Sequence, residues 1–152
     1  MMNLKHPEDP TWVLIRRLGY AGLIPFVFLA LCLWVVGEDL HPYVALSMQA
    51  YGGVIVSFLG GIHWGVGFRN AITAQQAPTV HFTWGVLPSI LAWVAVMMPA
   101  FGGLPLLGFV LIGCYLVDRK TWPDVGLAPW LPMRWRLTVV SSLSCFLAAG
   151  AT

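Results

Sequence analysis

The sequence predicts an all-α fold, a polytopic membrane helical bundle of five transmembrane helices with the N-terminus inside and the C-terminus outside. Hydrophobic residues make up 59% of the 152 residues and charged residues only 9%, whereas a soluble domain carries about 25% charge. The apolar residues gather in five segments, near the roughly 17–25 residues that a spanning helix needs. These segments cover residues 18–36, 43–68, 82–98, 102–117 and 136–151, and an inner loop covers 118–135. Together they fill nearly the whole chain, which predicts a single transmembrane domain over 1–152.

The basic residues predict the orientation, because Lys and Arg beside a helix end resist translocation. With the N-terminus inside, all eight fall on the inner side: Lys5, Arg16, Arg17, Arg69, Arg119, Lys120, Arg134 and Arg136. The first outer loop instead carries Glu38 and Asp39. We therefore expect a multi-pass protein of the cell inner membrane with the lipid bilayer as its main partner. Nucleic acid is not an expected partner, since the net charge is only +2 and the cations flank helices.

The first segment, 18–36, is long for a signal peptide and lacks a good cleavage site at Val35–Gly37, so we expect an uncleaved anchor. Proline removes a backbone hydrogen bond, so kinks are expected near Pro25 and near Pro88 in the third segment. The fourth segment is the least secure span, because it needs Gly102 and Gly103 to reach spanning length.

The inner loop 118–135 precedes the fifth segment and mixes prolines with Trp122, Trp130 and Trp135. Indole rings beside basic residues favour the headgroup level, so we expect this loop to lie on the inner membrane surface. Within it, Asp118 and Arg119 are interpreted as a solvated interfacial pair.

The second segment, 43–68, carries the densest pattern of small and polar residues. At every fourth position stand Gln49, Gly53, Ser57, Gly61 and Gly65, and a neighbouring row holds Gly52, Val56, Gly60, His63 and Gly67. Residues four apart share a helix face, and small residues let a second helix approach closely. We therefore expect helix packing at Gly53, Gly60, Gly61 and Gly65, with the serine-rich fifth segment as the natural partner.

Polar groups interrupt this stripe and predict a candidate site. A polar group without a partner costs several kcal/mol in hydrocarbon, so Gln49, Ser57 and His63 should point into the bundle. Candidate ligand-binding residues are Gln49, Ser57, His63, Trp64, Arg69 and His81. For His63, four roles remain open: a histidine that orders helix packing, a site for a small ligand, lipid headgroup or quinone, a proton or ion path, and metal or haem ligation. His81 is the one other histidine expected at a similar depth.

Signatures of enzymes are absent from the sequence. It contains no H-E-x-x-H, no G-x-S-x-G and no phosphate-binding loop, so no catalytic residue, metal site or cofactor is predicted. The cysteines Cys32, Cys114 and Cys145 each lie inside an apolar segment and are interpreted as packing residues, with a metal or thiol role as the minor alternative.

The stretch Tyr51–Gly65, YGGVIVSFLGGIHWG, resembles a bacterial and mitochondrial family of unknown function that includes animal transmembrane protein 69. Two further stretches resemble it, LGYAGLIPF at Leu18–Phe26 and Pro129-Trp130 followed by Arg134 and Arg136-Leu137-Thr138. The resemblance implies a small multi-helix inner-membrane protein. It implies no activity, substrate or catalytic residue.

Two functions from different classes follow from the sequence. The first is a non-enzymatic accessory or assembly component that packs against other membrane proteins, lipids or a second copy of itself. The alternative is a small transport or ligand-binding membrane protein with a polar intramembrane site on the second helix. A ligand site predicts a cavity at Gln49, Ser57 and His63, whereas a packing role predicts that the fifth helix fills that face. A weaker third option is an enzyme acting on lipid or quinone, based on His63, His81 and Arg69.

Overall fold

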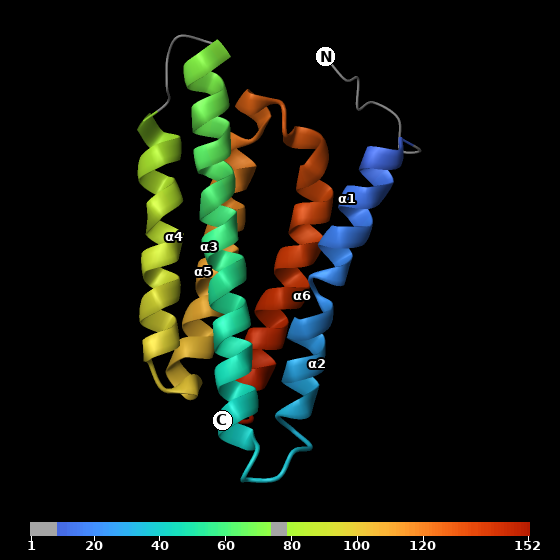
Figure 1. The fold of residues 1–152 in the computed structure, drawn as a ribbon, viewed down its shortest axis with the longest axis vertical. Helices are drawn as coiled ribbons and strands as arrows, with labels where there is room; N and C mark the ends of the chain where they lie inside the picture. The colour runs from blue at the N-terminus through green and yellow to red at the C-terminus, as the bar shows by residue number, and fades with distance from the viewer. Residues whose placement is uncertain (1–8, 74–78) are drawn as a thin grey trace.

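The computed structural model describes residues 9–73 and 79–152, and every regular element in this part of the chain is helical. Figure 1 shows long helices standing side by side as a bundle. In chain order they are α1 (Pro10–Ala21), α2 (Ile24–Cys32), α3 (His41–Thr73), α4 (Thr79–Met97), α5 (Ala100–Thr121) and α6 (Leu131–Ala149). Two short 3-10 turns, η1 (Pro123–Val125) and η2 (Ala128–Trp130), connect α5 to α6. The predicted all-α class is confirmed.

Helices α1 and α2 are two parts of one interrupted helix. The interruption falls at Gly22 and Leu23, directly before the predicted kink residue Pro25, which stands in the first turn of α2. Proline has no N–H to donate to the preceding turn, so the helix is interrupted before it and restarts with proline in a position it tolerates. Helix α1 buries none of its residues, whereas α2 buries Phe26 and Ala30.

Four helices are long and apolar enough to cross a membrane: the α1–α2 unit, α3, α4 and α5. The fourth segment, expected to be the least secure, is among them as α5 with 22 residues. Helix α6 also has 19 residues but is not among them. Its apolar stretch is diluted by Arg134, Arg136 and several serines.

The ends of the bundle separate the loops into two groups. Residues 9–10, the end of α3, the start of α4 and the η1–η2 turns lie at one end, and the α2–α3 and α4–α5 turns with the C-terminus lie at the other (Figure 1). The basic residues of α3, α5 and the start of α6 lie toward the first end. Lys5 lies outside the described residues.

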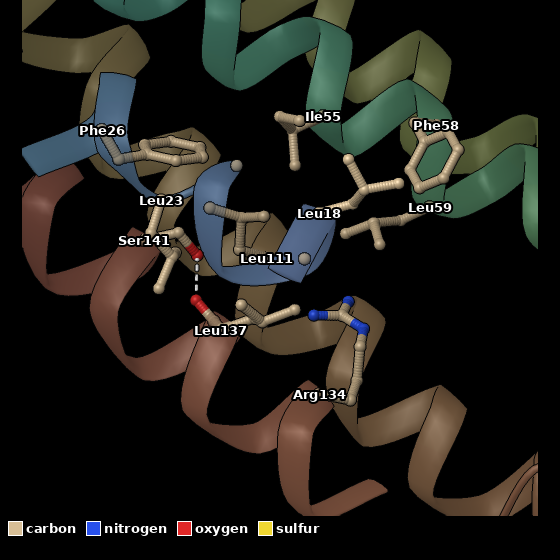
Figure 2. A pocket seen from close by; sticks show the side chains of 12 residues that line it. Leu18, Leu23, Phe26, Ile55, Phe58, Leu59, Leu111, Arg134, Leu137 and Ser141 are labelled. Carbon is tan, nitrogen blue, oxygen red and sulfur yellow. Dashed lines mark hydrogen bonds between the residues drawn. The ribbon is translucent and has the colours of Figure 1, made fainter. Parts of the chain in front are cut away.

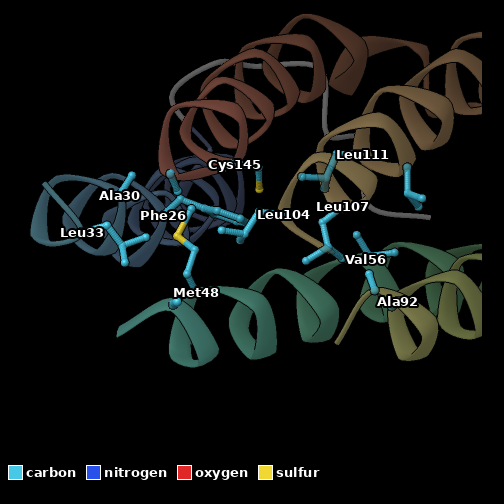
Figure 3. Packing of buried hydrophobic residues seen from close by; sticks show 14 of the residues in the cluster. Phe26, Ala30, Leu33, Met48, Val56, Ala92, Leu104, Leu107, Leu111 and Cys145 are labelled. Carbon is cyan, nitrogen blue, oxygen red and sulfur yellow. The ribbon is translucent and has the colours of Figure 1, made fainter. Parts of the chain in front are cut away.

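The core runs along the centre of the bundle, where α2, α3, α5 and α6 meet. Figure 3 shows Phe26, Met48, Leu104 and Cys145 packed together from these four helices. Cys114 is also buried in this cluster. Most large apolar side chains outside it face outward, as they do when lipid is the solvent.

Helix α3 is central, but its small-residue face does not pack on the fifth segment. It packs most extensively against α4 and also contacts α5 and α2, whereas α6 packs mainly against α5 and α2. The expectation that the serine-rich last helix covers α3 is therefore wrong. The turn at Met98 and Pro99 makes α4 and α5 a hairpin. This hairpin packs against α3 on the side that α6 was expected to cover.

Candidate functional site

Five polar side chains from four helices form a chain of hydrogen bonds inside the bundle, which we call the His63 network. Its members are His81, His63, Asp118, Arg134 and Thr138. His63 Nδ1 lies 2.9 Å from His81 Nδ1, and His63 Nε2 lies 2.9 Å from Asp118 Oδ1. Arg134 donates from Nε to Asp118 Oδ2 at 2.8 Å and from one terminal nitrogen to Thr138 Oγ1 at 2.6 Å. All five side chains are buried, with His63 1% and Asp118 2% exposed.

The partners fix the direction of these hydrogen bonds. The Asp118 carboxylate, paired with the Arg134 guanidinium, can only accept, so His63 Nε2 donates to it. With His63 neutral, its Nδ1 then accepts, and His81 Nδ1 donates. The hydrogen bonds therefore run from His81 through His63 to the Asp118 carboxylate, and from Arg134 to the same carboxylate and to the Thr138 hydroxyl. Such a network holds one tautomer of His63 in place.

The helices carry these residues at matching depth, close to the end of the bundle that holds the η1–η2 turns. Asp118 stands in the last turn of α5, and Arg134 in the first turn of α6, on the two sides of one connection. Thr138 follows Arg134 by four residues and so lies on the same face of α6. His81 stands in the first turn of α4, whereas His63 lies in the second half of α3, ten residues before the helix ends at Thr73. The connection between α5 and α6 thus brings the Asp118 carboxylate and the Arg134 guanidinium together, next to His63.

Asp118 corrects the sequence-based interpretation. The predicted inner loop 118–135 is shorter, because α5 continues to Thr121 and α6 begins at Leu131. Asp118 is buried and pairs with Arg134 and His63, whereas its neighbour Arg119 is exposed. Charge neutralisation across the hairpin lets the carboxylate lie inside the bundle, where an unpaired one would be too costly. The loop keeps its aromatic character, with Trp122 buried and Trp130 half-buried.

The other predicted site residues do not join the network. Gln49 lies at the opposite end of α3, where its side-chain amide donates to the carbonyls of Ala95 and Met98 at 2.9 and 3.0 Å. Ser57 donates to the carbonyl of Gly53 in its own helix. These two side chains and His63 therefore share no cavity.

Trp64 and Arg69 also lie outside the network. Trp64 donates from Nε1 to the Phe82 carbonyl at 3.1 Å and packs against Phe68 and Phe82, which ties α3 to the start of α4. Arg69 is exposed on the last turns of α3. Of the predicted ligand-binding residues, the structure brings together His63 and His81.

The predicted packing glycines divide into two pairs. A Cβ on Gly53 would meet Val96, and one on Gly60 would meet the backbone of Gly85, so both glycines lie at close contacts with α4. At Gly61 and Gly65 a Cβ would meet no atom of the described residues within 4 Å, and both face outward. The expectation of packing at Gly61 and Gly65 is corrected for this bundle. Relative to Gly60, which contacts α4, Gly61 is rotated about 100° around the helix axis and Gly65 about 140°.

An apolar groove runs beside Arg134 between α1, α3 and α6, and we call it the Arg134 groove. It consists of two adjoining cavities of about 160 and 370 Å³ that share six lining residues: Leu18, Gly19, Phe58, Leu59, Arg134 and Leu137. The larger cavity extends to Trp122 and Trp130, and the smaller one to Phe26, Leu111 and Ser141. Figure 2 shows the smaller cavity, with the Arg134 guanidinium reaching toward the apolar side chains of Leu18 and Leu59. Arg134 is the one charged residue in its lining.

Two residues that line this groove each carry a buried N–H donor with no partner within residues 9–73 and 79–152. The donors are the second terminal nitrogen of Arg134 and the indole nitrogen of Trp122. The two side chains are 5% and 6% exposed. An unpaired buried donor costs about 1–3 kcal/mol, more when it is charged, so such a pair at one cavity needs an explanation.

The His63 network is a hydrogen-bonded chain and not a ring of ligands around one point. His63 directs one ring nitrogen to His81 and the other to Asp118, so neither nitrogen has a free lone pair for a metal. Within the described ranges no group of three His, Cys, Asp or Glu side chains has metal-binding geometry. The chemistry that this arrangement offers is hydrogen-bond donation from a buried guanidinium held by a carboxylate.

Comparisons with known proteins extend over most of the chain. A family model described as "Protein of unknown function (DUF3429)" matches residues 13–150. Transmembrane protein 69 of Xenopus tropicalis is 41% identical over 80 residues, which cover 53% of this chain and 31% of that protein. Transmembrane protein 69 of Mus musculus is 32% identical over 77 residues, which cover 51% of this chain and 31% of that protein.

The aligned part therefore spans about a third of the length of these relatives. No solved structure matches the chain.

Proposed function

The chain belongs to the DUF3429 family of proteins of unknown function, and from this premise we propose that it is an inner-membrane protein that binds a small lipid-soluble molecule in the Arg134 groove. We further propose that α6 is a fifth span, with the N-terminus inside and the C-terminus outside. The bilayer is its solvent, and no cofactor, metal or nucleic acid enters the proposal.

One observation carries the binding function. The Arg134 side chain lines an apolar groove, its guanidinium is buried and held by Asp118 and Thr138, and its second terminal nitrogen has no hydrogen-bond partner in the described part of the chain. Ionisable residues inside membrane segments are costly, and those that persist usually mark a functional site. A purely structural ion pair is most stable when all its donors find partners within the protein. A binding site keeps donors for its ligand, so the geometry favours ligand binding over the accessory or assembly role.

The groove also has the size and lining of a binding site. Ligand sites are mostly apolar with a few polar groups that set orientation. An apolar cavity of about 150 Å³ admits benzene, and the larger part of the Arg134 groove measures about 370 Å³. Its walls belong to α1, which is the least buried helix, and to α3 and α6, which scarcely contact each other. A molecule dissolved in the bilayer could therefore enter beside α1.

Native mass spectrometry of the gently extracted protein tests this proposal. In the variant Gly19→Leu the new side chain would project toward Met133 and Leu137 and fill the groove. We expect the wild type to retain a small lipid-soluble molecule and this variant to lose it. The matched control is Gly113→Leu, because a Cβ on Gly113 meets no described atom within 4 Å.

The control should retain the molecule. Equal retention in both variants, or a wild type that carries only a partner protein unaffected by Gly19→Leu, would contradict the proposal and favour the accessory role.

A further inference from the structure

We propose that the molecule bound in the Arg134 groove is an uncharged lipophilic carbonyl compound of the quinone type, with carbonyl oxygens as acceptors for the unpaired N–H groups of Arg134 and Trp122. This inference rests on the proposed function and adds the chemical class of the ligand. It is argued from the donors that the groove leaves unused, from the charges around them and from the shape of the walls.

The unused polar groups of the groove are donors. Arg134 and Trp122 both line the groove, and each has a buried N–H without a partner in the described ranges. The hydroxyl of Ser141, which also lines the groove, already donates to the carbonyl of Leu137 at 2.7 Å. A ligand that satisfies this site must therefore bring an acceptor atom such as a carbonyl oxygen, and an alkane or a protonated amine would leave the donors unpaired.

The charge balance favours an uncharged acceptor. Arg134 is the one cation that lines the groove, and the Asp118 carboxylate already neutralises it at 2.8 Å. A second carboxylate or a phosphate on the same guanidinium would lie close to Asp118 in a site of low dielectric, where like charges repel strongly. A carbonyl oxygen can accept a hydrogen bond from Arg134 or from Trp122 without adding charge.

The walls favour a flat ring followed by an apolar tail. The larger cavity is bordered by the indoles of Trp122 and Trp130 and by Phe58, and aromatic side chains pack well against flat rings. The smaller cavity continues to Ser141, seven residues beyond Arg134 along α6, which is about 10 Å toward the middle of the bundle. A ring in the larger cavity beside Trp122, with its tail in the smaller cavity beside Phe26 and Leu111, would follow the shape of the groove.

Equilibrium binding in phosphatidylcholine nanodiscs tests the chemical class. The probes are a decyl-substituted benzoquinone and oleate, each measured on the full chain and corrected with empty nanodiscs. We expect saturable binding of the benzoquinone, and binding of oleate at least about tenfold weaker because of the repulsion from Asp118. Oleate binding as tight as that of the quinone would overturn the inference.

Two tryptophan variants test the donor. Trp122→Phe removes the indole N–H but keeps an aromatic ring, and loss of one hydrogen bond should weaken quinone binding about three- to tenfold. Trp84→Phe is the matched control, since its indole nitrogen is also buried without a partner in the described part of the chain but lies outside the groove lining. We expect the control to bind like the wild type. Equal effects of the two substitutions would contradict the role of Trp122.

The native mass measurement separates the two proposals. A retained molecule that Gly19→Leu removes, but that excess benzoquinone does not displace, would overturn the quinone class and leave ligand binding in the groove intact. Displacement of the retained molecule by the benzoquinone would support both ligand binding in the Arg134 groove and the quinone class of the ligand.

Discussion

At the scale of single residues, Asp118 is a buried carboxylate whose charge is balanced inside the bundle. Its carboxylate is nearly inaccessible and depends on Arg134 and His63 for compensation. Removing one member of a buried pair leaves the other charge without compensation, whereas removing both charges costs far less. The contribution of the Asp118–Arg134 pair to stability thus depends on both charges being present.

We therefore expect Asp118→Asn to lower the free energy of unfolding by about 3–5 kcal/mol, because it leaves Arg134 charged and buried. Equilibrium unfolding in mixed micelles measures this change. Asp124→Asn is the matched control, since Asp124 is exposed in η1, and it should change stability by less than about 0.5 kcal/mol.

The double variant with leucine at both Asp118 and Arg134 should be more stable than either single leucine variant. A double variant as unstable as the sum of the two would show that the charges are not coupled.

At the scale of helices, the contact between α3 and α4 depends on the absence of side chains at two glycines. A Cβ on Gly85 would lie 2.8 Å from the carbonyl oxygen of Gly60, and one on Gly60 would meet the backbone of Gly85. Backbone cannot move aside as a flexible side chain can. This close approach is how helices gain packing energy in lipid, where no hydrophobic force drives them together.

Gly60→Ala should destabilise the bundle by about 1–3 kcal/mol, as overpacking of a tight contact does. Gly61→Ala, one position along, provides the control because its Cβ would enter open space. It should be neutral or slightly stabilising, since alanine favours a helix over glycine by about 0.5–1 kcal/mol. The same unfolding assay measures both, and equal destabilisation would refute the α3–α4 contact.

At the scale of the whole molecule, the number of membrane crossings depends on α6. Four helical units have the length and composition of spans, while α6 has the length and a more polar composition. Its polar groups Arg134 and Thr138 are buried against the rest of the bundle, so they would not meet lipid. The burial of these groups therefore supports the proposed fifth span.

A reporter fused after Thr152 tests the proposed topology in cells. With five spans the C-terminus lies outside, so a periplasmic reporter should be active and a cytoplasmic one inactive. Cysteines introduced in place of Glu38 and Lys120 should be labelled from opposite sides, with Glu38→Cys reactive from outside. A C-terminus found inside would mean that α6 does not cross the membrane.

The sequence by itself determined the all-α class, the membrane character, the approximate segments and the family, because apolar segments of spanning length and short motifs are local properties of the chain. It also placed His63 and His81 at a similar depth, since each position follows from distance along one helix. What the sequence did not reveal was the pairing of Asp118. Beside Arg119 the carboxylate looked solvated, and only the fold brings Arg134 and His63 to it.

The tertiary structure likewise decided which face of α3 meets which helix. The spacing of the small residues predicts a close contact but not its partner, and the α4–α5 hairpin occupies the face that the serines of α6 were expected to cover. The Arg134 groove is also a tertiary feature, because its walls come from α1, α3 and α6, which are distant in the sequence. Local pattern determines what a helix can bury, whereas the competition among all helices determines against which partner it is buried.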